Sequence, residues 1–178
     1  MKYMGILMMA AAVTGAGFLA AERWRERLLL LLEFRQMIYY LKGQILYTNA
    51  TLPEVLYEVG TKLEEGKRGN RAEPGRMLLR VERRLREDGK TSFSVAWQEE
   101  VKRLPADFPM SRSDRQTLAT LGENLGYADR KMQERTLLFY LEQTEDSIAF
   151  LKKESDGRMR LYRCMGMAAG LFLMVMMA

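Results

Sequence analysis

The chain has no histidine and only one cysteine, Cys164, among its 178 residues. Histidine is the commonest general base, the usual proton switch near neutral pH and the most frequent ligand of transition metals, so its absence argues against most catalytic and metal sites. A single cysteine excludes an internal disulfide and a multi-cysteine metal site. We therefore expect a protein of a reducing compartment that is not an enzyme and that holds no cofactor and no metal.

Proline is also scarce, with four residues, whereas leucine, methionine, arginine, glutamate and alanine are abundant. This composition favours helix over sheet and predicts an all-α fold. The length allows one domain of about 140 residues together with two short apolar segments. The 28 basic against 23 acidic residues could reflect nucleic acid, acidic lipid, an acidic protein partner or simple solubility, and the sum does not decide between them.

Long uncharged runs occur only at the two ends. Tyr3 to Ala21 is long enough to cross a bilayer as a helix, and Cys164 to Ala178 would be a short second span. The first run could instead be a cleaved signal peptide, and the second a buried core helix. Arginines directly after the first run oppose translocation, and the bulky apolar tail would aggregate unless it met lipid. Two transmembrane helices are the better interpretation of these runs.

Two spans would leave both termini on one side and the region between them on the other. Basic residues next to the spans lie almost entirely in that middle region, which is therefore predicted to be cytosolic. The predicted division is a transmembrane helix at 1–21, a cytosolic domain at 22–163 and a transmembrane helix at 164–178. Small residues at helical spacing could let the spans pack closely or could simply be tolerated there: Gly15, Gly17, Gly166 and Gly170.

Apolar spacing predicts about six helices in an antiparallel bundle. A helix should run from the first span to about Tyr47, and a long last helix should begin at Asp129, each with apolar residues alternating three and four apart. Between them we expect helices at about 52–63, 76–87, 92–104 and 113–126, with a loop at 64–75. Capping boxes are predicted at Thr51-Leu52-Pro53-Glu54 and at Ser113-Asp114-Arg115-Gln116.

One predicted helix carries a dense basic face. Its arginines on neighbouring turns could bind anionic headgroups or an acidic partner, or could form a solvated face: Arg76, Arg80, Arg83 and Arg84. No aromatic residues interleave with them and no nucleic-acid motif is present, so nucleic acid is not expected as a partner. Carboxylates at Glu142, Glu145 and Asp146 could hold a cation, but exposed acids on a long helix look the same.

The run Leu121-Gly122-Glu123-Asn124-Leu125-Gly126-Tyr127-Ala128-Asp129-Arg130, followed by Gln133, resembles the stage III sporulation protein AB family of endospore-forming bacteria. Its motif residues here are Gly122, Glu123, Leu125, Gly126, Asp129 and Arg130. The resemblance extends to Ile45-Leu46-Tyr47, to Thr51-Leu52-Pro53-Glu54 and to the glycines of both spans. Gln44 departs from the pattern, because the family is expected to have glutamate there.

This resemblance implies a non-enzymatic, membrane-anchored platform subunit of a secretion-like channel complex between mother cell and forespore. The protein would lie in the outer forespore membrane and face the mother-cell cytosol. Its domain would be similar to the inner-membrane platform of type II secretion and type IV pilus systems, and would dock a cytosolic secretion-type ATPase and other channel subunits, with a homo-oligomer as a further option. A membrane-anchored sensor or regulatory binding module is the alternative, and it requires a ligand pocket among the helices.

Overall fold

The computed structural model describes the backbone except at residues 1, 49, 90, 127–129 and 178, and the side chains within 22–126 and 131–154 apart from 49 and 90. In this part of the chain every regular element is helical, which confirms the all-α prediction. The elements are α1 (Lys2–Tyr47), α2 (Leu52–Glu64), the 3₁₀ helix η1 (Gly69–Ala72), α3 (Glu73–Glu87), α4 (Phe93–Arg103), α5 (Arg112–Leu125) and α6 (Arg130–Met177).

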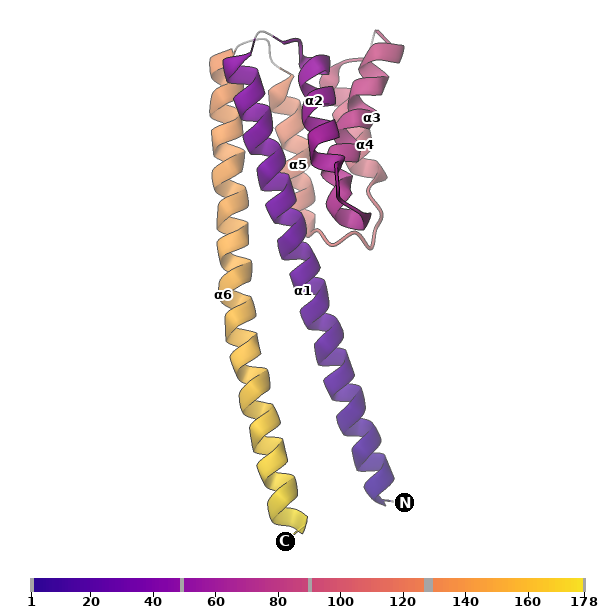
Figure 1. Ribbon diagram of the computed structural model, residues 1–178, viewed down its shortest axis with the longest axis vertical. Helices are drawn as coiled ribbons and strands as arrows, with labels where there is room; N and C mark the ends of the chain where they lie inside the picture. The colour runs from indigo at the N-terminus through magenta and orange to yellow at the C-terminus, as the bar shows by residue number, and fades with distance from the viewer. Residues whose placement is uncertain (1, 49, 90, 127–129, 178) are drawn as a thin grey trace.

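The two longest helices lie side by side and antiparallel, and both project from the same end of the bundle (Figure 1). Their predicted apolar seams are buried except at the half-buried Leu141, with Leu41 of α1 and Leu137 of α6 at most 1% exposed. Below the main core the two helices still touch through Leu31, Ile148 and Leu151. We call the paired parts of α1 and α6 that extend beyond the bundle the stem. The stem brings the two chain ends to one end of the molecule.

The shorter helices complete the bundle beside α1. The helices pack as a ring in chain order: α1 lies against α2, α2 against α3, α3 against α4, α4 against α5, α5 against α6, and α6 against α1 (Figure 1). Trp97, Leu56 and Met77 are fully buried at the centre of the core. Since each helix buries one apolar stripe and exposes a charged one, a single continuous core is enough to hold the bundle together.

Two details of the expected helix boundaries were wrong. The segment 64–75 is not all loop, because η1 forms within it and α3 begins at Glu73 rather than Arg76. Pro74 fits the first turn of α3, where a missing N–H costs nothing. Gly75 then allows α3 to approach α2 closely, since a Cβ there would lie 2.7 Å from the Gly60 carbonyl oxygen. The proline and glycine that suggested a loop are thus the start of a helix.

The two predicted capping boxes had different outcomes. Thr51 and Glu54 form the box at the start of α2, where the Glu54 carboxylate accepts the Thr51 backbone N–H at 2.7 Å. At α5 the cap is Ser111 rather than Ser113, because the Ser111 hydroxyl accepts the Asp114 N–H and the Asp114 carboxylate accepts the Ser111 N–H, both at 3.1 Å. Asp114 also accepts from Arg27 of α1 at 2.8 Å. One carboxylate therefore caps α5 and fastens it to the stem.

Among the residues whose side chains are described, no helix is long and apolar enough to cross a membrane. The two predicted spans lie outside those residues, as do the four glycines predicted to pack them, Gly15, Gly17, Gly166 and Gly170. The helical backbone of α1 and α6 continues through both segments. The spans and the domain limits at 21 and 164 stay predictions.

Candidate partner-binding surface

The four arginines predicted to contact a partner separate into two pairs on α3. Arg76 and Arg83 are exposed, and Arg76 donates to Glu64 of α2 at 3.1 Å. Arg80 and Arg84 lie on the side of α3 that packs against α4, where both meet carboxylates. Arg76 and Arg83 are therefore the accessible pair; Arg83 has no described ion pair, and Arg76 has one exposed ion pair, of a kind that contributes little to stability.

A buried carboxylate explains why Arg80 and Arg84 are occupied. Glu100 of α4 has no exposed surface, and Arg80, Arg84 and Arg103 all pair with it, with Arg103 at 2.9 Å and Arg84 at 3.6 Å. Arg80 also donates to Glu73 at 2.6 Å. A buried carboxylate needs such partners, because an uncompensated charge in the core is strongly destabilising. The cluster joins α3 to α4.

The protonation of these groups follows from their contacts. Desolvation by itself would lower the pKa of Arg80, but its hydrogen bonds to Glu100 and Glu73 outweigh that cost and the pKa is raised. The hydrogen bond between Arg84 and Glu99 raises the pKa of Arg84 and lowers the pKa of Glu99. Arg84 and Glu99 hence stay charged at neutral pH.

Sequence reasoning missed this cluster, although one signal was present. Glu100 falls on the stripe of α4 that otherwise contains Phe93, Ala96, Trp97 and Val101, all of them buried. A carboxylate on an apolar stripe requires a basic partner from another helix. The arginines of α3 were the nearest candidates in the sequence.

An open trough of about 400 Å³ lies between α2 and α3. Its lining combines the partly buried Leu79 and an exposed tyrosine with charges of both signs: Tyr57, Thr61, Glu82, Arg83, Arg86 and Glu87. Arg86 pairs with Glu82 at 2.6 Å, which leaves Arg83 as the cation without a described ion pair on this wall. An aromatic ring beside arginine is the combination that dominates protein interfaces, so the trough suits a protein segment.

The motif that carries the family resemblance packs the core. A Cβ on Gly122 would lie 2.0 Å from Cδ1 of Trp97, so the indole ring can lie against α5 only where there is no side chain. Trp97 also donates its Nε1–H to the Leu118 carbonyl at 2.7 Å. Leu125 is buried, Glu123 is exposed and accepts from Gln98, and Gly126 ends α5. Asp129 and the side chain of Arg130 lie outside the described residues.

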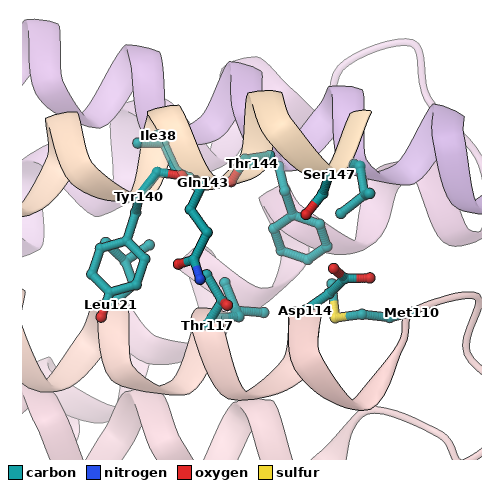
Figure 2. Close-up of a pocket in the computed structure, with 12 residues that line it drawn as sticks. Ile38, Met110, Asp114, Thr117, Leu121, Tyr140, Gln143, Thr144 and Ser147 are labelled. Carbon is teal, nitrogen blue, oxygen red and sulfur yellow. Dashed lines mark hydrogen bonds between the residues drawn. The ribbon is translucent and has the colours of Figure 1, made fainter. Parts of the chain in front are cut away.

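A small cavity of about 30 Å³ lies between α5, α1 and α6, with room for about one water molecule. Gln143, Thr144 and Ser147 of α6 face Asp114 and Thr117 of α5 across it (Figure 2). Within the described residues, no group of three acidic, cysteine or histidine side chains is close enough to hold a metal ion. A cavity of this size is smaller than the ligand pocket that a sensor requires.

Comparison with known proteins agrees with the motif. The family model of stage III sporulation protein AB matches residues 2–178. Stage III sporulation protein AB of Bacillus subtilis (strain 168) is 23% identical over 177 residues, which are 99% of both chains. A solved structure of stage III sporulation protein AB shares the fold, with a TM-score of 0.62 at 21% identity over 74% of this chain and 97% of that one. The protein described here therefore belongs to the stage III sporulation protein AB family.

Proposed function

We propose that the protein is a non-enzymatic, membrane-anchored platform subunit of a sporulation-specific, secretion-like channel complex between mother cell and forespore. In this role it docks a cytosolic secretion-type ATPase and contacts other stage III channel subunits. It lies in the outer forespore membrane with its bundle in the mother-cell cytosol. Membership of the sporulation family supports the setting.

The stem is the observation that carries this proposal. Both chain ends project from one end of the bundle as parts of α1 and α6 (Figure 1), and both are uncharged in sequence, at 3–21 and 164–178. Two apolar helices leaving one end suit insertion in a bilayer, because a helix satisfies its own backbone hydrogen bonds there. The remaining faces of the bundle are then free for partners in the cytosol.

The exposed arginines and the trough support docking of a protein rather than a small molecule. Arg76 and Arg83 extend outward from α3, and Tyr57 and Arg83 border the trough. A platform needs such a surface and no catalytic group. The cavity of about 30 Å³ is too small for the ligand of a sensor, and the trough of about 400 Å³ is open and lined mainly by charged side chains, unlike the mostly apolar pockets that bind small molecules.

The test is binding of the full chain, reconstituted in nanodiscs, to the secretion-type ATPase of the same organism, with and without nucleotide. We expect binding by the wild type and a loss of at least about tenfold in affinity for the Arg76→Glu/Arg83→Glu variant, since rim and anchor charges act directly on association. Arg35→Glu/Arg135→Glu carries the same change of net charge on α1 and α6, away from the trough, and should bind normally. Absence of binding by the wild type in both nucleotide states would refute the docking role.

A further inference from the structure

The topology brings two basic loops to the end of the bundle from which the stem projects. Residues 65–72 connect α2 to α3, and residues 102–112 include the end of α4 and the start of α5 (Figure 1). These segments are far apart in sequence. Together they contain two acidic residues, Glu65 and Asp107, against six basic ones: Lys67, Arg68, Arg71, Lys102, Arg103 and Arg112.

Three of these basic side chains are not used by the fold. Lys67 and Arg71 pair with the buried Glu33, and Arg103 pairs with Glu100. Arg68, Lys102 and Arg112 are exposed and form no ion pair with a described residue. We call these three side chains the basic underside.

The opposite end of the bundle carries charges of both signs. Four carboxylates are exposed where α2 begins, α3 ends and α5 ends: Glu54, Glu87, Asp88 and Glu123. Arg86 near the end of α3 and Lys131 at the start of α6 are exposed there too. The basic underside is therefore a local feature of the two loops near the stem.

The stem sets the height of the basic underside. Arg27 of α1 binds Asp114, two residues after Arg112, at 2.8 Å. Arg27 comes six residues after Ala21, where the uncharged segment ends, which is about 9 Å along a helix. The headgroup layer extends roughly 5–7 Å beyond the hydrocarbon core on each side. Charges at this height therefore lie within the Debye length of about 8 Å from anionic headgroups.

We propose that the basic underside binds the headgroups of anionic lipids around the stem. This inference rests on the membrane anchoring in the proposed function and adds a lipid class to it. Each arginine or lysine near an anionic surface contributes favourable free energy, and three from two loops resist tilting of the bundle as well. The contact would hold the trough at a defined height and angle above the bilayer.

The experiment uses the full chain in liposomes of phosphatidylcholine with 30% phosphatidylglycerol. Electron spin resonance of spin-labelled lipids measures the fraction of each lipid immobilised by the protein. We expect the wild type to select phosphatidylglycerol over phosphatidylcholine, and Arg68→Glu/Arg112→Glu to lower that selectivity by at least about twofold. Salt at about 0.5 M should lower the lipid selectivity of the wild type toward that of the variant, because exposed charges are then screened.

The matched control is Arg35→Glu/Arg135→Glu, which makes the same change of net charge at exposed positions of α1 and α6 away from the underside. It should keep the selectivity of the wild type. Equal selectivity in all three proteins, with each of them in the liposomes, would overturn the lipid proposal and leave an acidic protein as the partner of the underside. Failure of the wild type to enter liposomes at all would refute the anchoring instead, so the two results are distinguishable.

Discussion

At the scale of single residues, the family motif is explained by packing. Gly122 is required because the ring of Trp97 occupies the place of its side chain. Glu100 is tolerated in the core because arginines from α3 and from its own helix surround it. At both positions, a side chain from another helix determines which residue type the fold can accommodate.

Replacing Gly122 tests that explanation. Gly122→Ala should lower the free energy of unfolding by about 3 kcal/mol, because the indole of Trp97 must move and lose its hydrogen bond to Leu118. Gly43→Ala is the control, since a Cβ there meets nothing within 4 Å and alanine favours a helix by about 0.5–1 kcal/mol. Thermal melts of the detergent-solubilised chain, followed by circular dichroism, measure both. Similar melting temperatures for the two variants would contradict the packing role.

Acid should destabilise the protein through its lowered carboxyl pKa values. The Thr51 backbone N–H lowers the pKa of Glu54, and Arg84 lowers the pKa of Glu99, both below 4.5. A lowered folded-state pKa gives stability that is present above pH 4.5 and is lost as the pH falls through the folded value. The difference in melting temperature between wild type and Glu99→Gln should accordingly be constant near pH 6–7 and shrink below pH 4.5. A difference that does not depend on pH would show that the ion pair adds nothing.

At the scale of elements, each helix of the bundle depends on another for its charges. The α3–α4 pair shares the Glu100 cluster, and α5 is capped and fastened to α1 by Asp114. α2 and α3 cross with their backbones in close contact at Gly60 and Gly75. The basic face of α3 is consequently divided. Arg80 and Arg84 join α3 to α4, whereas Arg76 and Arg83 are exposed.

The joint between α3 and α4 can be tested at its buried acid. Glu100→Gln should lower the free energy of unfolding by about 2 kcal/mol, because three arginines lose their shared anion. The neighbouring Glu99→Gln should change stability much less at neutral pH, because exposed ion pairs contribute little. Urea titrations at pH 7 compare the two. If the two substitutions cost the same, Glu100 is not the centre of the joint.

At the scale of the whole molecule, α1 and α6 belong to both the bundle and the stem. Beside the main core they form a second, smaller hydrophobic cluster, in which Leu31 packs with Ile148 and Leu151. Because this cluster resists separation of the two helices near the stem, we expect a push on the bundle to reach the stem.

Truncation within the seam tests this coupling. Leu151→Ala should cost about 2–5 kcal/mol, since the side chain is 1% exposed and leaves a cavity between the helices. Phe150→Ala, at a ring that is 64% exposed on the adjacent position, should have little effect. Thermal melts of the full chain in detergent give both values. An equal loss of stability in the two variants would mean that the stem is not packed as described.

The sequence determined by itself which segments form helices, the two apolar seams and one of two capping boxes, because these depend on residues within a few positions of each other. Local signals were misleading at Pro74 and Ser113, where the same residue types suit more than one boundary. Only the tertiary structure decided that Arg80 and Arg84 belong to Glu100, that Trp97 needs Gly122, and that Arg68, Lys102 and Arg112 share one end. These contacts join segments far apart in the chain, and their formation depends on which helix faces another across the core.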